Sequence, residues 1–219
     1  MNIHIFLHTV TEGIREESMN CLIKKNQICE TVLLAILERR LNMKDIQYML
    51  AKILGRLKKD REQETVLRFF RKNGISIGGG VRIYSNILTP ESELIRIGSD
   101  VTISNGVTFV THDNSIIKVL PDATDLFGSI TIGNHCFIGS HSILLYGVEI
   151  ADNVIIAAGS VVTSSVKESN VIVGGNPAKV ISTWEKFAHK SRVNAWDLSR
   201  IPWEDVLCRL KQGERIVKR

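Results

Sequence analysis

The chain has 219 residues, of which 44% are hydrophobic and only 6% are aromatic, so a sizeable core must be built from Ile, Val, Leu and Ala. The net charge is +5 and the sequence pI is about 9.1, an excess that suits an anionic partner but is also ordinary for a protein surface. The sequence has no apolar run of about 18 residues, which argues against a membrane-spanning helix.

Neither the cysteines nor the N-terminus suggests secretion. Cys21, Cys29, Cys136 and Cys208 form no CxxC pair, which favours a reducing compartment and argues against a disulfide framework. The opening segment MNIHIFLHTVTEGIREE is apolar for only a few residues and then acidic, unlike a signal peptide. We therefore expect a cytoplasmic protein.

Residues 1–73 are predicted to be helical. The segments QICETVLLAILERR and DIQYMLAKILGRLKKD carry apolar residues at helical spacing with charges between them. The basic clusters RLKKDR and RFFRK fall on helical faces and should be solvated, so no nucleic-acid partner is expected. We expect these helices to cap the domain that follows, whose open edge would otherwise be adhesive.

Residues 74–182 contain a repeat of six residues. Cut into sixes, residues 130–165 read ITIGNH, CFIGSH, SILLYG, VEIADN, VIIAAG and SVVTSS. The same pattern occurs upstream, in residues 75–86 and 95–112. The third position of every block in the long run is aliphatic: Ile132, Ile138, Leu144, Ile150, Ile156 and Val162.

A period of six matches neither a helix of about 3.6 residues per turn nor the two-residue alternation of a long strand. It matches a short strand followed by a tight turn, and three such sides, each one hexad long, close a triangular coil. Stacked coils pair their strands in parallel and bury the aliphatic column, with Gly, Asn and Asp at the corners. The sequence therefore predicts a mainly β fold, a parallel β-helix.

Two interruptions of the period stand out. The step from Ile87 to Ile95 is eight positions, two more than one hexad, so two residues are extra around the segment TPES. The second interruption is the segment 113–129, DNSIIKVLPDATDLFGS, whose 17 residues do not fit the repeat. They must leave the coil as a loop. Loops on rigid scaffolds commonly carry function.

The last part of the chain, residues 183–219, carries Trp184, Trp196 and Trp203 among charged residues. We expect a C-terminal helical extension that packs on the solenoid or on a neighbouring chain.

His112 closes the block VTFVTH at the root of the long loop. Histidine suits proton transfer near neutral pH, because its unperturbed pKa is about 6.5. A histidine at a corner can also be a turn residue bonded to backbone. Its place beside the loop favours a functional role.

The chain resembles the hexapeptide acyltransferases, most closely the sugar O-acetyltransferases that include the maltose, galactoside and polysaccharide-modifying enzymes. The resemblance covers roughly residues 74–182 and rests on the hexads, on THDN before the loop, and on IGNHCFIGSHSIL, IIAAGSVVT and GGNPAKVI. It implies a left-handed β-helix, a homotrimer with active sites between subunits, acetyl-CoA as co-substrate and no metal. In that family the histidine before the loop is the general base, a role that comes to His112.

The resemblance assigns five further positions. Asn86 in YSN matches an acceptor-side asparagine, although a left-handed corner residue explains it equally well. Ser140 matches a position whose backbone N–H lies near the thioester oxygen, where a donor stabilises a developing oxyanion. Ala158 matches a small residue beside the pantetheine arm, although the repeat itself also requires a small residue there. Thr163 matches a CoA-contacting threonine, and Lys179 a basic residue near the nucleotide phosphates.

The sequence departs from the family at Ser164, where relatives often place a lysine, and at Ser182, where an arginine can stand. The grip on the phosphates would then rest on Lys179 and Lys167, or be weaker.

A zinc site is the alternative for the histidines, because β-helix carbonic anhydrases bind zinc with three of them. His112, His135 and His141 each end a hexad, so they should project from corners. His135 and His141 are also six residues apart, whereas a spacing near five is expected in that family. Both features argue against zinc.

These observations predict a CoA-dependent O-acetyltransferase that acts on a sugar or polysaccharide hydroxyl by direct transfer, with His112 activating the acceptor. Serine, an amino-sugar amine or an antibiotic are the alternative acceptors. A non-catalytic β-helix scaffold is the alternative from another class, and His112 with its loop argues against it.

Overall fold

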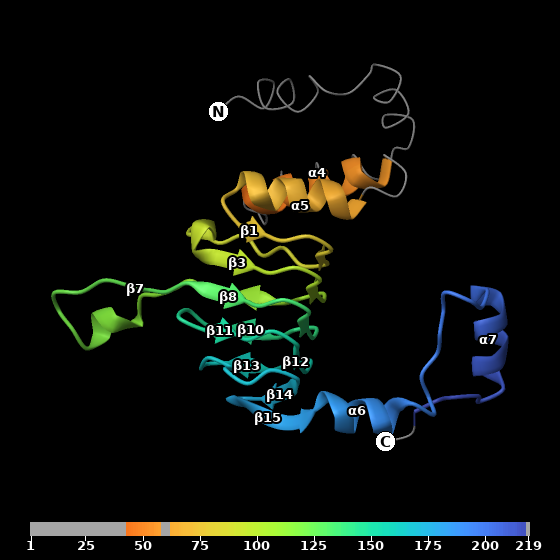
Figure 1. Ribbon diagram of the computed structural model, residues 1–219. Helices are drawn as coiled ribbons and strands as arrows, with labels where there is room; N and C mark the ends of the chain where they lie inside the picture. Colours follow the sequence, from red (N-terminus) through yellow and green to blue (C-terminus); the bar gives the residue numbers. More distant parts are fainter. Residues whose placement is uncertain (1–42, 58–61, 218–219) are drawn as a thin grey trace, which may run out of the picture.

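The computed structural model describes residues 43–57 and 62–217, and its centre is a solenoid of short strands stacked in coils (Figure 1). The helix expected in QICETVLLAILERR, together with Cys21 and Cys29, lies outside the described residues. Cys136 is buried and Cys208 is exposed, and both are free thiols. Within the described residues, no helix has the length and apolar character needed to cross a membrane.

Within the described residues, the strands of the solenoid form three sheets, one for each side, and β6 and β7 of the long loop form a separate two-stranded sheet. The first sheet contains β1 (Ser76–Ile77), β3 (Ile95–Ile97), β8 (Ile130–Ile132) and β11 (Glu149–Ile150). The second contains β2 (Arg82–Ile83), β4 (Thr102–Ile103), β9 (Phe137–Ile138), β12 (Val154–Ile156), β14 (Val171–Gly175) and β15 (Ala178–Thr183). The third contains β5 (Thr108–Phe109), β10 (Ile143–Leu144) and β13 (Val161–Val162).

The strand register confirms the coil length and both interruptions. In the regular part each strand pairs in parallel with the strand three hexads further on, as Ile132 does with Ile150. Across the long loop the partners are further apart in the sequence. The separation of Ile97 and Ile132 equals one coil plus the loop residues 113–129. Across TPES the partners are Ile77 and Ile97, whose separation is one coil plus the two extra residues.

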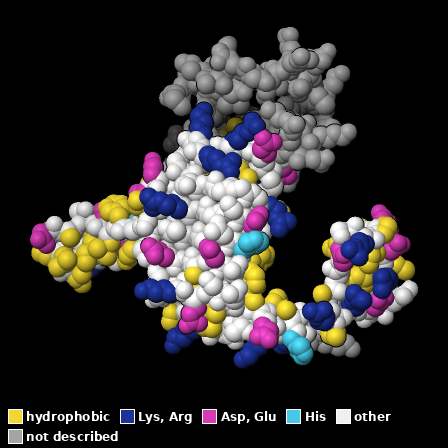
Figure 2. All heavy atoms as spheres, viewed as in Figure 1, with side chains coloured by type: hydrophobic (Ala, Val, Ile, Leu, Met, Phe, Trp, Pro, Cys, Tyr) yellow, Lys and Arg dark blue, Asp and Glu magenta, His cyan; other side chains and the backbone are white. Residues whose placement is uncertain are grey.

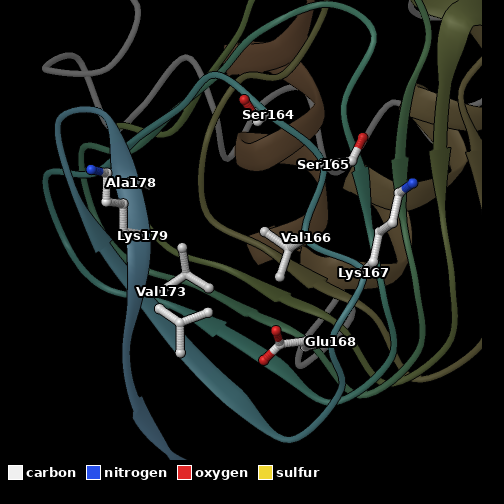
Figure 3. Close-up of a pocket in the computed structure, with 9 residues that line it drawn as sticks. Ser164, Ser165, Val166, Lys167, Glu168, Val173, Ala178 and Lys179 are labelled. Carbon is white, nitrogen blue, oxygen red and sulfur yellow. The ribbon is translucent and has the colours of Figure 1, made fainter.

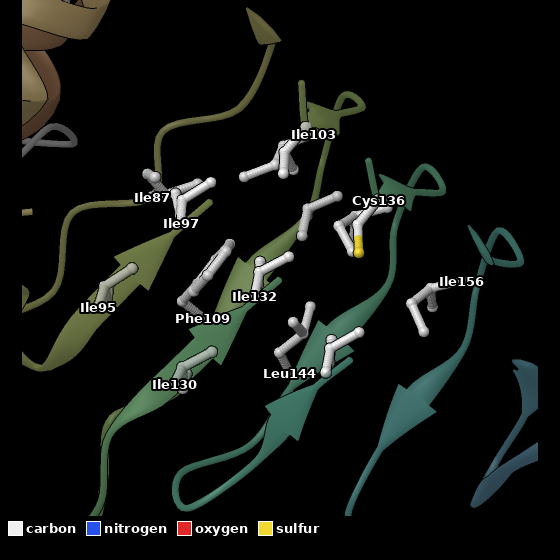
Figure 4. Packing of buried hydrophobic residues seen from close by; sticks show 14 of the residues in the cluster. Ile87, Ile95, Ile97, Ile103, Phe109, Ile130, Ile132, Cys136, Leu144 and Ile156 are labelled. Atoms are coloured by element: carbon white, nitrogen blue, oxygen red, sulfur yellow. The ribbon is translucent and has the colours of Figure 1, made fainter. Parts of the chain in front are cut away.

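The aliphatic third positions form the core, as the repeat predicts. All six of these residues in the long run are at most 2% exposed. Figure 4 shows how Ile132, Leu144 and Ile156 lie inside the coils, level above level, with Ile95 and Ile97 from an earlier coil. Because each coil buries only a few side chains, the stability of the solenoid comes from contacts between neighbouring coils.

Two helices lie over the first coil: α4 (Met43–Leu57) and α5 (Glu62–Lys72) (Figure 1). α5 contacts β1 and β2 and buries Val66 and Phe70 in the same core as the aliphatic column. The side chain of Gln63 donates to the carbonyl of Ile83 at 3.3 Å and accepts from its N–H at 2.8 Å. The helix thus satisfies backbone groups of a strand that would otherwise present a free edge.

The long loop projects sideways from the solenoid (Figure 1). It begins with β6 (His112–Asp113), continues through η2 (Ser115–Lys118) and returns through β7 (Leu126–Phe127). β6 and β7 pair antiparallel over two residues, and this pair forms the neck of the loop. The interruption around TPES holds a second short helix, η1 (Ser92–Leu94).

Beyond the last coil, β14 and β15 form an antiparallel hairpin, which leads into α6 (Trp184–Ser191) and α7 (Trp203–Lys211). α7 stands away from the solenoid (Figure 1). The ring of Trp196 lies under the guanidinium groups of Arg209, 4.9 Å from the ring centroid, and Arg215, at 5.4 Å. These contacts hold α7 to the segment that precedes it.

Candidate active site

His112 lies in β6, where the third side of a coil turns outward into the long loop. Its Nδ1 is 3.0 Å from Oε2 of Glu91. The same carboxylate oxygen accepts a hydrogen bond from Oγ1 of Thr111 at 2.8 Å. The side chains of His112 and Glu91 are 39% and 26% exposed, so both can be reached from solvent.

The carboxylate determines which nitrogen of His112 can act as a base. A carboxylate oxygen only accepts hydrogen bonds, so in the neutral imidazole Nδ1 carries the hydrogen and Nε2 keeps its lone pair. Desolvation raises the pKa of Glu91, but the hydrogen bonds from Thr111 and His112 outweigh it and leave that pKa below its usual value. The pair therefore joins an ionised carboxylate to an imidazole whose Nε2 is free to take a proton.

Glu91 was not identified from the sequence, although the interruption at TPES marks its position. The extra residues fold into a tight turn, in which Oγ of Ser92 donates to the carbonyl of Thr89 at 2.8 Å and accepts from its N–H at 3.2 Å. Glu91 precedes η1 at this turn and reaches His112, 21 residues further along the chain. The two-residue insertion thus provides the partner of the histidine.

The loop neck supplies one wall beside the imidazole. The ring of Phe127 on β7 lies 5.9 Å from the ring of His112, centroid to centroid, at an angle of 42°. Further out, the loop carries exposed apolar side chains, which Figure 2 shows as hydrophobic surface on the projection. These are Ile117, Val119 and Leu120, and Leu126 and Phe127 of the neck are exposed as well.

Asn86 lies in the first coil and is held by the helical region. Its Nδ2 donates to Oδ1 of Asp45 on α4 at 2.6 Å, and its Oδ1 accepts from the N–H of Leu88 at 3.3 Å. Asn86 is not among the residues with positive φ, so the interpretation as a left-handed corner residue is wrong. Its side chain instead bonds to α4 and to the N–H two residues further on, as an Asn in a turn can do without a left-handed backbone.

Ser140 and Ala158 are brought together at one corner of successive coils. They are one coil apart in the sequence, and the carbonyl of Ser140 accepts from the N–H of Gly159 at 2.8 Å. A Cβ on Gly139 would lie 2.5 Å from the backbone nitrogen of Ala158, so the two coils touch through their backbones here. Ala158 is exposed and Ser140 is half-buried, which leaves this corner open to a ligand.

Lys179 and Lys167 line a cavity of about 400 Å³ at the far end of the solenoid (Figure 3). Ser164 and Ser165 form part of its rim, directly after the exposed Thr163. The full lining is Ser164, Ser165, Val166, Lys167, Glu168, Val173, Ala178, Lys179 and Val180. The lining thus contains two lysines and one glutamate, which gives it a small excess of positive charge.

The remaining predicted positions lie elsewhere. Ser182 is not part of the cavity lining and donates through Oγ to the carbonyl of Thr183 at 3.4 Å. His135 and His141 are corner residues with φ of 56° and 59°, as their place at the ends of hexads predicts. Nε2 of His135 lies 3.6 Å from Oδ2 of Asp100 at the surface. Among the described residues, no three His, Cys, Asp or Glu side chains gather as metal ligands would.

Comparison with known proteins found several that share the repeat. Residues 129–164 match the family model described as the hexapeptide repeat of succinyl-transferase. Protein CapG of Staphylococcus aureus is 46% identical over 131 residues, which cover 57% of this chain and 75% of that protein. The galactoside O-acetyltransferase of Escherichia coli K12 is 33% identical over 119 residues, which cover 54% of this chain and 58% of that enzyme.

One solved structure, a hexapeptide-repeat-containing acetyltransferase of Vibrio cholerae, aligns with a TM-score of 0.48 and 23% identity. The alignment covers 63% of this chain and 92% of that one.

Proposed function

The chain belongs to the hexapeptide-repeat acyltransferase family, and we propose that it transfers an acetyl group from acetyl-CoA to a hydroxyl of a sugar or polysaccharide precursor. The observation that carries the proposal is the His112–Glu91 pair at the root of the loop. The similarity to a galactoside O-acetyltransferase supports the choice of a sugar hydroxyl over an amine.

The pair suits base catalysis of acyl transfer. Nε2 of His112 removes the proton of the acceptor hydroxyl while that oxygen attacks the thioester carbonyl carbon. Glu91 stabilises the imidazolium that forms. The tetrahedral intermediate then collapses, the C–S bond breaks, and the imidazolium returns its proton to the CoA thiolate. No covalent enzyme intermediate is needed, because both substrates react while held side by side.

The CoA side of the proposal uses the corner between β9 and β10 and the segment from the end of β12 to the end of β13 on the next coil. The backbone N–H of Ser140 is the proposed donor to the oxyanion. Ala158 and Thr163, on the next coil, would line the pantetheine arm. The cavity with Lys179 and Lys167 would take the nucleotide phosphates, whose charges its two ammonium groups complement.

The acceptor site is proposed at the end of the solenoid that α4 and α5 cover. Asn86, with Asp45 of α4 holding its amide, is the proposed contact for an acceptor hydroxyl. The long loop would form a second wall of that site. We further propose the left-handed winding of the family, a homotrimer with each site between two subunits, a cytoplasmic location and no metal requirement.

The test is thiol release from acetyl-CoA in the presence of a panel of acceptors: galactosides, glucosides, amino sugars, nucleotide sugars and serine. Wild-type protein should release CoA with a sugar hydroxyl, and His112→Ala should do so at least about 100-fold more slowly. His189→Ala, which changes an exposed histidine on α6, is the matched control and should keep full activity. Release of CoA only with an amine acceptor would move the proposal to N-acetylation.

A further inference from the structure

Tyr146 is an unusual residue for its place in the repeat. It occupies the fifth position of the block SILLYG, at the corner between β10 and β11. The fifth positions of the other five blocks in this run carry small or short polar residues: Asn134, Ser140, Asp152, Ala158 and Ser164. A large aromatic side chain at an outer corner adds nothing to the aliphatic column, so its contacts need another explanation.

The phenol of Tyr146 reaches the loop. Its OH donates to Oδ2 of Asp113 at 3.3 Å, and the side chain is half-buried. The other oxygen of Asp113 accepts from the N–H of Ser115 at 2.8 Å. Asp113 directly follows His112 on β6. The carboxylate of Asp113 therefore links β6 both to the start of η2 and to the next coil of the solenoid.

The neck of the loop rests on the same corner through its backbone. Gly128 donates to the carbonyl of Thr111 at 3.0 Å, and Gly147 donates to the carbonyl of Ser129 at 2.9 Å. A Cβ on Gly128 would lie 2.5 Å from the nitrogen of Gly147, so the chain can approach this closely only with glycine there. The corner that carries Tyr146 is thus the support on which the loop leaves the solenoid.

We propose that Tyr146 is a positioning residue for His112: its hydrogen bond to Asp113 holds β6 in place against the next coil. This inference rests on the proposed function. The β6–β7 pair is only two residues long, and the loop beyond it is largely exposed. The Tyr146 bond therefore adds a restraint on β6 to the backbone hydrogen bonds of the neck and to the contacts of Glu91. Glu91 orients the imidazole ring, whereas Tyr146 holds the backbone from which the ring extends.

The distinction has a kinetic consequence. A base must lie within hydrogen-bond reach of the acceptor proton, and a displacement of about 1 Å is enough to slow the reaction. Losing the Tyr146 hydrogen bond should therefore lower kcat and leave the cavity of Lys179 unaffected. The KM for acetyl-CoA should not change.

The test compares Tyr146→Phe, which removes only the hydroxyl, with wild-type protein. We expect kcat to fall about 3- to 10-fold, the size of one partly exposed hydrogen bond. We also expect faster amide hydrogen exchange in residues 113–128, with exchange in the coils unchanged. Tyr84→Phe is the matched control, because Tyr84 is an exposed tyrosine on the first coil, and it should change neither quantity.

A double variant checks that the two side chains act through one bond. In an Asp113→Ala background, Tyr146→Phe should have no further effect on kcat. Independent, multiplying losses would overturn the proposal, as would unchanged exchange in the loop of Tyr146→Phe. Faster loop exchange with an unchanged kcat would overturn it too, because the contact would then hold the loop without positioning the base.

The two proposals fail in different ways. A wild-type protein without acetyl transfer to any acceptor refutes the proposed function and with it the positioning role. An active wild-type protein whose Tyr146→Phe variant keeps full kcat refutes the positioning role alone.

Discussion

Replacing Glu91 by Gln tests how much the carboxylate contributes to the base. Both hydrogen bonds to this side chain, from His112 and from Thr111, reach the same oxygen, Oε2. The amide oxygen of Gln can take that place and accept both, so Glu91→Gln removes the charge and keeps the geometry. Glu91→Ala removes the charge and both contacts.

The expected loss follows from the geometry of the pair. A hydrogen bond that involves a charged group is worth about 1.5–3 kcal/mol, and the value belongs at the lower end here because both side chains are partly exposed. The imidazolium that develops in the transition state is the species that the carboxylate stabilises. A loss of about 1–2 kcal/mol corresponds to a fall in kcat of roughly 5- to 30-fold for Glu91→Gln. Glu91→Ala should lose more, because Nδ1 then has no fixed acceptor.

The assay is CoA release at saturating acetyl-CoA as a function of pH. Folding lowers the pKa of Glu91. A carboxyl group of this kind contributes to the stability of the fold at a pH above its unfolded pKa. The contribution is lost only as the pH falls through its folded pKa. Above the ordinary carboxyl value of 4.5, the carboxylate therefore stays charged, and the difference in kcat between wild type and Glu91→Gln should be fully present.

The reasoning is refuted if Glu91→Ala keeps wild-type kcat with an unchanged pH profile. A fall in kcat that accompanies a fall in thermal stability of several degrees would instead indicate damage to the turn. Ser92→Ala, which loosens the same turn without touching His112, separates the two effects.

Three further predictions concern the base, the CoA site and the assembly. His112→Ala should lower kcat by about 10²–10⁴-fold, the usual contribution of a general base. Its affinity for acetyl-CoA, measured by calorimetry, should stay within a few-fold of wild type. A folded variant that keeps more than about a tenth of its activity would mean that another group is the base. Lys179→Ala should weaken acetyl-CoA binding about tenfold at low salt, since it removes a charged contact, and the difference should shrink as salt rises; an unchanged affinity at low salt would move the phosphate contact to Lys167. Light scattering at micromolar concentration should give the mass of a trimer, and a monomer would contradict a site between subunits.

The coil architecture could be read from the sequence because it is periodic. The third position of each hexad faces the core, so one pattern determines the buried column, the register between coils and the corners. The interruptions were visible for the same reason: the extra residues at TPES and in the loop appear in the observed pairing as wider separations between strand partners. His112 was identifiable as a candidate because it stands at the border between repeat and loop.

The partners of the site residues depended on the tertiary structure. Glu91 contacts His112, 21 residues further along the chain. Asp45 and Asn86 are 41 residues apart, and Asp113 and Tyr146 are 33 residues apart. None of these separations is a multiple of the coil length. The repeat determines where the backbone of each coil lies, because burying the aliphatic column leaves one register. It does not determine where an insertion, a capping helix or a projecting loop folds back, because those paths follow from contacts that no local period encodes.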